Sequence, residues 1–109
     1  MKYKKSRNKA EIKREIGNIL EEEINNPIIK NVSITDITTD DDFTFAKVYF
    51  MTRELDFKKV EEELNKASSF IRKNLAKNLN LRSTPELRFV YDDTIDYANK
   101  IDKLIEENE

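Results

Sequence analysis

The chain has 109 residues, of which 39% are charged and 38% are apolar, and its formal net charge is −2. It contains no cysteine, histidine or tryptophan, which excludes disulfides and thiolate metal sites and removes the commonest general base and the strongest side-chain nucleophile of enzymes. The length fits one domain, and the sequence shows neither a secretion signal nor an apolar run long enough to cross a membrane. We therefore expect a cytoplasmic protein that is not an enzyme, has no catalytic or metal-binding residues, and needs no membrane or cofactor.

An amphipathic helix is predicted over residues 7–25. Ser6 is a suitable N-cap, and Pro27 closes the helical pattern. The apolar positions repeat with helical spacing and form one stripe, which consists of Ile12, Ile16, Ile19, Leu20 and Ile24.

Two antiparallel strands are predicted at residues 32–39 and 43–52, joined by a polar turn at 40–42. Successive side chains of a strand point to opposite faces of the sheet. The face expected to meet the helices contains Ala46, Val48 and Phe50. The other face is expected to be at least partly wet because it includes a lysine, and it contains Phe43, Phe45, Lys47, Tyr49 and Met51.

Residues 56–80 have an apolar position every three or four residues, which predicts one long helix or two helices that meet at residues 67–69. Pro85 rules out further helix, "ELRFVYD" alternates as a third strand, and a last helix is predicted over residues 94–107. A strand that returns after a helical crossover tends to run parallel to the strand it left. The predicted fold class is therefore α+β, with a mixed three-stranded sheet that helices cover on one face.

Charge is segregated along the chain. Residues 1–14 contain seven basic residues against one acidic residue (net +6), and residues 66–88 contain six against one (net +5). Residues 15–65 contain five basic residues against thirteen acidic ones (net −8), and residues 89–109 contain two against seven (net −5). Two basic blocks in an acidic chain indicate a surface for an anionic partner. The alternative is that these blocks pair with the acidic segments inside the fold.

The element order α-β-β-α-α-β is that of the type II KH domain, in which the turn between two consecutive helices meets a nucleic-acid backbone. The second helix of the pair would begin near residues 67–69, so its positive dipole end and first N–H groups would point at phosphate. Ser68 or Ser69 could cap that helix, and Arg72, Lys73 and Lys77 follow within two turns. The alternative is a helix softened by serines, with basic residues that are simply solvated.

The segments "DDDFTFAKVYF" and "LNKASSFIRKNLAKNLNLRSTPELRFVYDDTID", together with the first helix, resemble the bacterial ribosome-binding factor A family over nearly the full length. The residues that match the family pattern in order and spacing are Arg72, Leu81, Arg82, Pro85, Glu86, Leu87, Phe89 and Asp92. The resemblance implies a cytoplasmic assembly factor with a KH-like fold that binds the small (30S) ribosomal subunit, contacts 16S rRNA and supports its late maturation, notably in the cold. The family usually has Ala-x-Gly between the two helices. Here Ala67 and Ser68 fit, but Ser69 stands in place of the glycine, which favours a kink over a tight turn.

We predict a type II KH-like RNA-binding domain at residues 1–92 and an acidic C-terminal helix or tail at 93–109. The expected partners are the 30S subunit and its 16S rRNA, with ribosomal proteins as further candidates, and the expected state is a monomer. The predicted RNA-binding residues are Lys4, Lys5, Arg7, Lys9, Lys13, Arg14, Lys66, Ala67, Ser68, Ser69, Arg72, Lys73, Lys77 and Arg82. Lysine and arginine would neutralise phosphates there, with recognition by shape.

Several other interpretations remain open. The acidic segment 15–65 could dock on a basic ribosomal protein, which would make RNA contact incidental. The acidic triplet 40–42 could hold Mg²⁺, even in a nuclease, although an exposed hairpin turn is the simpler explanation. Phe43, Phe45 and Tyr49 could stack on bases, or only on their cross-strand neighbours. The apolar stripe 57–79 could form a dimer seam, but burial against the sheet explains it without a partner.

Overall fold

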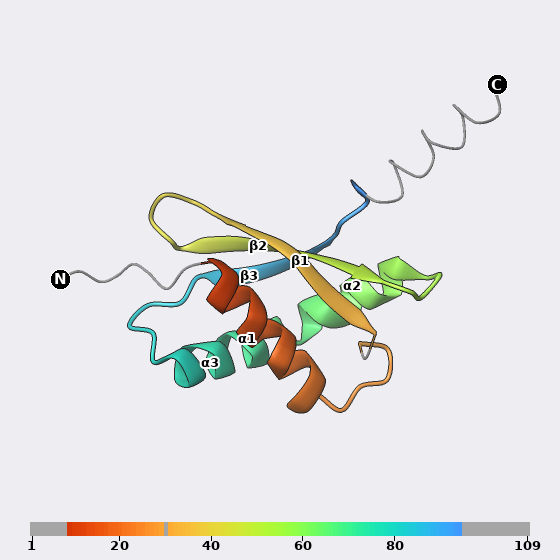
Figure 1. Ribbon diagram of the computed structural model, residues 1–109, viewed down its shortest axis with the longest axis horizontal. Helices are drawn as coiled ribbons and strands as arrows, with labels where there is room; N and C mark the ends of the chain where they lie inside the picture. The colour runs from red at the N-terminus through yellow and green to blue at the C-terminus, as the bar shows by residue number, and fades with distance from the viewer. Residues whose placement is uncertain (1–8, 30, 95–109) are drawn as a thin grey trace, which may run out of the picture.

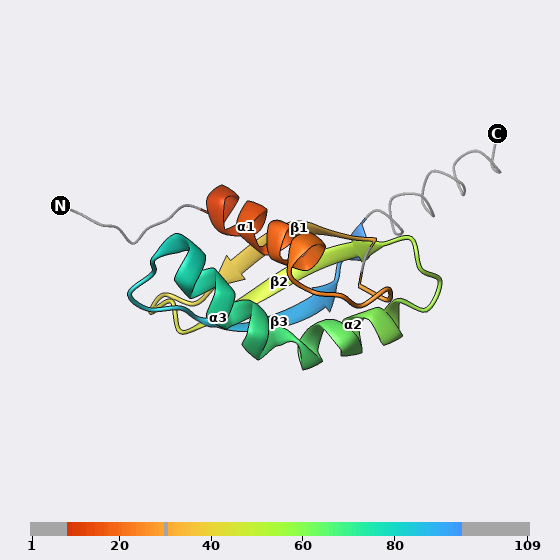
Figure 2. The same ribbon diagram turned by 90° about the horizontal axis from the view of Figure 1, so that it is seen from below.

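The computed structural model describes residues 9–29 and 31–94. Three helices lie on one face of a three-stranded sheet (Figures 1 and 2). The elements in chain order are α1 (Lys9–Glu22), β1 (Val32–Thr39), β2 (Phe45–Thr52), α2 (Phe57–Lys66), α3 (Ser68–Leu79) and β3 (Glu86–Tyr91). The strand order is β1-β2-β3, with β1 antiparallel and β3 parallel to β2. The predicted α-β-β-α-α-β order and mixed sheet are confirmed.

Helix α1 packs against the sheet through Ile12, Ile16 and Ile19, but it ends at Glu22, three residues before the predicted boundary. Pro27 disfavours a helical conformation at the residue before it. Asn26 forms a turn instead, because its side-chain Oδ1 accepts a hydrogen bond from the backbone N–H of Ile28 at 3.0 Å. The predicted start of this helix and its Ser6 cap lie outside the described residues.

The inward face of the sheet is the predicted one, since Ala46, Val48 and Phe50 are each at most 2% exposed. The prediction for Phe43 is wrong, because β2 begins at Phe45. Phe43 lies in the turn with a φ of 59°, and its side chain packs against the core. Asp40 holds this wider turn: its carboxylate accepts hydrogen bonds from the N–H of Thr44 at 2.7 Å, the N–H of Phe45 at 3.1 Å and the Thr44 hydroxyl.

Strand β1 contains a bulge between Ile34 and Asp36, which shifts its register with β2. The extra residue is Thr35, whose hydroxyl donates to Asp92 Oδ2 at 2.5 Å. Its carbonyl accepts from Lys13 Nζ at 3.3 Å. The bulge therefore connects the first strand to both α1 and the segment that follows β3.

Helices α2 and α3 are separate but almost continuous, with only Ala67 between them. Ala67 has φ −91° and ψ 2°, its N–H donates to the carbonyls of Glu63 (3.2 Å) and Leu64 (3.1 Å), and its own carbonyl accepts from Ile71 N–H at 3.0 Å. Among the described residues other than glycine, only Phe43 and Asn80 have positive φ. The joint is thus a kink and not a tight turn, in agreement with the serine at position 69.

The apolar stripe of α2 and α3 is buried within the chain, because Val60, Leu64, Ile71 and Leu75 are at most 1% exposed. Core packing therefore accounts for the positions that suggested a dimer seam. Helix α3 ends at Leu79, and its C-cap Asn80 adopts the left-handed conformation (φ 55°, ψ 45°). The last predicted helix, 94–107, lies outside the described residues apart from its first position.

Side chains of α2 cover the outer edge of β3. Asn65 Oδ1 accepts from the N–H of Phe89 at 2.8 Å, and Asn65 Nδ2 donates to the Phe89 carbonyl at 3.0 Å. Glu61 Oε2 accepts from the N–H of Tyr91 at 2.9 Å. An unpaired strand edge is open to pairing with another chain, and these bonds close it from within the molecule.

Candidate nucleic-acid interface

The kink between α2 and α3 places a basic stripe on the solvent side of the helices. Ile71 and Leu75 are fully buried, so the opposite face of α3 points outward. Residues three and four apart on a helix are surface neighbours, which groups the exposed Phe70, Lys73 and Lys77 into one row on α3. Lys66, the last residue of α2, is exposed on the other side of the kink. Lys73 and Lys77 have no acidic side chain within ion-pair distance among the described residues.

Beside this row, Arg72 holds the loop that follows α3. Its Nε and Nη2 donate to the carbonyl of Thr84 at 3.2 and 2.8 Å. A hollow of about 360 Å³ lies there, lined by Ser69, Arg72, Lys73, Ala76 and Thr84. A guanidinium has five N–H donors, and Arg72 spends two of them on the loop. Arg72 therefore fixes the loop that lines the hollow, and its remaining N–H donors and positive charge can still face a ligand there.

The predicted serine cap of α3 is wrong. The N-cap residue is Ala67, and no side chain bonds to the helix start. Because the kink occupies a single residue, Ser68 and Ser69 fall inside the first turn of α3 and not before it. Side chains of the exposed row, and not a serine-capped turn, are thus the groups that the joint presents to solvent.

The basic residues of α1 lie elsewhere. Lys9 forms an ion pair with Asp36 (Nζ to Oδ1, 3.4 Å), and Lys13 donates to the Thr35 carbonyl. With the exposed Arg14 they lie on the β1 side of α1, where Lys13 and Arg14 line a second hollow of about 440 Å³ between α1 and β1. The side of α1 facing α3 has an acid instead, since Glu15 accepts from Asn78 Nδ2 of α3 at 2.8 Å.

The predicted RNA-binding residues that the structure describes form two groups, which correspond to the two basic blocks of the sequence. One runs from Lys66 at the end of α2 along α3 to Lys77, and Arg82 lies exposed in the loop after it. The other lies along α1 and β1. Lys4, Lys5 and Arg7 are outside the described residues. Phe70, which the sequence prediction did not include, is exposed on α3 beside Lys73, and its position off the buried apolar stripe was a usable signal of that exposure.

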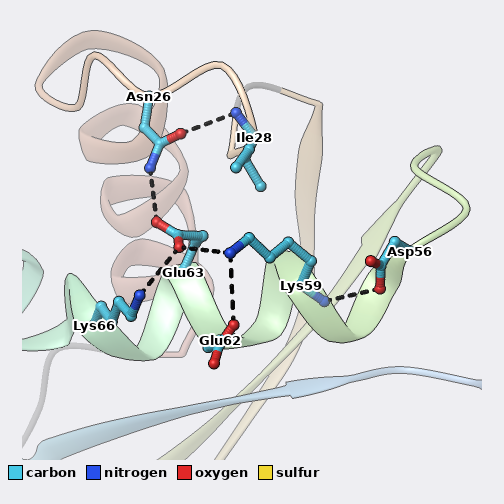
Figure 3. Close-up of polar contacts among 7 residues, drawn as sticks. All are labelled: Asn26, Ile28, Asp56, Lys59, Glu62, Glu63 and Lys66. Carbon is cyan, nitrogen blue, oxygen red and sulfur yellow. Dashed lines mark hydrogen bonds and ion pairs between the residues drawn. The ribbon is translucent and has the colours of Figure 1, made fainter.

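An internal network of charges runs along α2 and includes Lys66. Figure 3 shows Glu63 at its centre, where it accepts from Asn26 Nδ2 at 3.1 Å and pairs with Lys66 at 3.4 Å and Lys59 at 3.6 Å. The hydrogen bond from Asn26, followed by the two lysines, lowers the pKa of Glu63 below its ordinary value of 4.5. Internal pairing, the alternative interpretation of the charge segregation, thus holds for Lys9 and Lys66 but not for Lys73 and Lys77 among the described residues.

Two other candidate sites have structural explanations. Asp40 is engaged by the hairpin turn, which lowers its pKa through the Thr44 hydroxyl above all. Among residues 9–29 and 31–94 no cluster of acidic side chains is suited to hold a metal ion. On the open face of the sheet, Phe45 is 36% exposed but pairs in register with Glu86, an acid that opposes RNA. Within the same residues, none of the helices has the length and apolar character of a membrane span.

Comparison with known proteins identifies the family. The ribosome-binding factor A family model matches residues 4–105. Ribosome-binding factor A of Clostridium botulinum (strain Eklund 17B / Type B) is 43% identical over 108 residues, which cover 95% of this chain and 93% of that protein. The crystal structure of ribosome-binding factor A from Thermus thermophilus has a TM-score of 0.70 at 18% identity and covers 76% of this chain and 89% of that one.

A second similar structure is a homology model of Thermus thermophilus ribosome-binding factor A that was fitted into the cryo-EM map of its complex with the 30S subunit. It has a TM-score of 0.66 at 18% identity and covers 77% of this chain and 90% of that one. At these identities the structures establish the fold, which is KH-like. The family match and the Clostridium relative, both of which span most of the sequence, establish more: this chain belongs to the ribosome-binding factor A family.

Proposed function

We propose that this protein is a monomeric, non-enzymatic assembly factor of the cytoplasm that binds the small ribosomal subunit through 16S rRNA. The observation on which the proposal rests is the exposed row on α3, in which Lys73 and Lys77 have no acidic partner among the described residues. The relative fitted into the map of a 30S complex supports the choice of partner. The proposed outcome of binding is late maturation of 16S rRNA, including in the cold.

Binding would be electrostatic in its main part. Each phosphate neutralised by a lysine or arginine releases counterions, so affinity falls as salt rises, by about 0.7–0.9 log units per log unit of salt for each contact. Lys73 and Lys77 lie on one face of α3 and would contact successive phosphates. Contacts to phosphate fix position without reading sequence, which fits recognition of rRNA shape.

The proposed RNA-binding body is residues 1–92, and the acidic segment 93–109 is proposed to be separate from it. Asp92 supports this boundary because its carboxylate accepts from the Thr35 hydroxyl of β1 and from the N–H of Thr94 at 3.0 Å. The first bond joins Asp92 to strand β1 of the sheet, and the second joins it to the start of the acidic segment.

Co-sedimentation with purified 30S subunits at increasing salt tests the proposal. Lys73→Glu/Lys77→Glu should weaken binding more than about tenfold and reduce the slope of log affinity against log salt by about 1.4–1.8. The matched control is Arg53→Glu/Lys58→Glu, which changes the net charge equally at exposed positions outside the row. Equal loss in both variants, or binding that ignores salt, would contradict the proposal.

Two further measurements test the alternative of docking on a ribosomal protein and the proposed role in the cell. A partner that the protein still captures from lysate after complete nuclease digestion would favour docking on a ribosomal protein. Glu61 and Glu63 of the acidic segment already bond within the chain, which weighs against that rival. In a strain that lacks the gene, 16S rRNA precursors should accumulate at low temperature, and wild type but not Lys73→Glu/Lys77→Glu should clear them.

A further inference from the structure

We propose that the Phe70 ring is a stacking platform for an unpaired base of the bound RNA, because it lies exposed on α3 within the row of lysines. The inference rests on the proposed function and specifies it: the row would take a single-stranded nucleotide, in a loop, bulge or end, and not only a duplex backbone.

Phe70 lies outside the hydrophobic core. Its neighbour Ile71 and the following Leu75 are fully buried, whereas the Phe70 side chain faces outward and the residue is 44% exposed. The other large apolar residues exposed within the described part of the chain are Phe45 and Leu55. Single exposed apolar residues are ordinary on protein surfaces. Exposure alone therefore does not make Phe70 a binding residue, and the proposal depends on the residues that surround the ring.

Cations flank Phe70 along the helix. Lys73 and Lys77 follow it by three and seven residues, which places them on the same face of α3. Lys66, the last residue of α2, precedes it by four residues across the kink. Lys66 pairs with Glu63 at 3.4 Å, whereas Lys73 and Lys77 have no acidic partner in the described ranges. By contrast, Phe45 is paired directly with the acidic Glu86, with Lys47 and Arg88 as the next pair on the same face of the strands, and Leu55 is not aromatic.

The spacing suits one nucleotide. Side chains at i and i+3 of a helix have their Cβ atoms about 5–6 Å apart, close to the separation of a phosphate from its own base. Lys73 also lines the hollow held by Arg72 and Thr84, so it lies between that hollow and the ring. An RNA strand that leaves the hollow would place a phosphate at Lys73 and the attached base over Phe70.

An aromatic ring beside phosphate-binding cations is the arrangement that single-strand binding proteins use, because every base offers a π-face. Bases inside a duplex are already stacked on their neighbours and cannot cover the ring. The ring therefore distinguishes unpaired from paired RNA, while the lysines serve both.

The absence of tryptophan from the chain makes a direct test possible. Phe70→Trp creates a single fluorescent reporter with an aromatic face, and Leu55→Trp, at a residue 98% exposed, is the matched control. Each is titrated with a 12-nucleotide single-stranded RNA, a 12-base-pair RNA duplex and 30S subunits. Phe70→Trp should be quenched by the single strand and by 30S subunits, and Leu55→Trp by neither.

Affinities of Phe70→Ala and Phe70→Leu complete the experiment. Both should lose about 5-fold to 150-fold in affinity for the single strand, the range of one base–aromatic stack, and stay within twofold of wild type for the duplex. Thermal melting checks that each variant folds. Retained affinity in Phe70→Leu, an equal loss for the duplex, or no quenching of Phe70→Trp by either single strand or 30S subunits would overturn the stacking proposal.

These outcomes differ from failure of the proposed function. If Phe70 variants bind like wild type while Lys73→Glu/Lys77→Glu do not, the protein binds RNA without stacking at Phe70. If wild type binds neither RNA nor 30S subunits, the proposed function itself fails, and the stacking proposal is overturned with it.

Discussion

Asn65 provides a quantitative test of how α2 is fixed to the sheet. Replacement by alanine removes the two hydrogen bonds to the backbone of Phe89, a residue only 1% exposed, and one bond to the Glu61 carbonyl within the helix. Each buried backbone group left without a partner costs about 1–3 kcal/mol. Alanine recovers roughly 0.5 kcal/mol through its higher helix propensity. We expect a loss of about 1.5–5.5 kcal/mol in the free energy of unfolding.

The matched control is Asn74→Ala in α3. Asn74 Nδ2 donates to the Phe70 carbonyl at 2.9 Å, four residues back, as Asn65 does to Glu61. Unlike Asn65, the Asn74 side chain bonds to no other element of the described structure. Helix propensity and the local bond therefore cancel in the comparison. The remaining difference isolates the two bonds to Phe89.

Urea and thermal unfolding followed by circular dichroism measure the difference. At about 4–8 °C per kcal/mol for a domain of this size, the two lost bonds to Phe89, at about 1–3 kcal/mol each, should make Asn65→Ala melt at least about 8 °C below Asn74→Ala. If the two variants agree within about 0.5 kcal/mol, water or a shift of the strand replaces the side chain at no cost. The conclusion that α2 closes the edge of β3 would then be refuted.

Three further predictions concern the joint, the charge network and the loop. Ser69→Gly should lower the free energy of unfolding by about 0.5 kcal/mol, because position 69 is helical with negative φ, and should leave 30S affinity within twofold; a clear gain in affinity would mean that a tighter turn is the active form. The pKa of Glu63 is lowered chiefly by the hydrogen bond from Asn26, so the ionised side chain stabilises the fold above the unfolded pKa, and this stability is lost as pH falls through the folded pKa. The difference in free energy of unfolding between wild type and Glu63→Gln should therefore shrink below about pH 4.5 in urea titrations. A difference that is unchanged at about pH 3 would contradict this. Arg72→Lys keeps the charge but loses the paired bonds to the Thr84 carbonyl, so hydrogen exchange in the loop at 80–85 should speed up, whereas Lys77→Arg should leave it unchanged.

The element order followed from the sequence because local periodicity determines it. The alternation of Ala46, Val48 and Phe50 identified the buried face of β2, and the direction of β3 followed from its helical crossover. Features set by single side chains were not predictable in this way. Asp40 widens the hairpin turn and moves Phe43 out of the strand, and Thr35 forms a bulge whose partner, Asp92, is 57 residues away.

The same distinction applies to the candidate interface. Lys73 and Lys77 could be predicted to face solvent, because they lie opposite the buried stripe of α3. Net charge over a segment could not reveal that Lys9 pairs with Asp36 or that Lys13 bonds to Thr35. Those partners become neighbours only when α1 packs beside β1. The net charge of a segment therefore does not show which basic side chains are paired in the fold and which could bind RNA.

The kink at Ala67 has a consequence for how such a surface binds. A glycine with positive φ at position 69 would let the backbone itself approach a phosphate. Here Ser69 is part of the first turn of α3, with negative φ and no capping bond, and the groups presented to solvent are the side chains of α3. In the proposed binding mode, recognition by flexible lysines and one ring would depend on salt and on unpaired bases more strongly than recognition by a rigid backbone turn. Substitutions at Phe70, Lys73 and Lys77 should therefore alter binding far more than any change at Ser69.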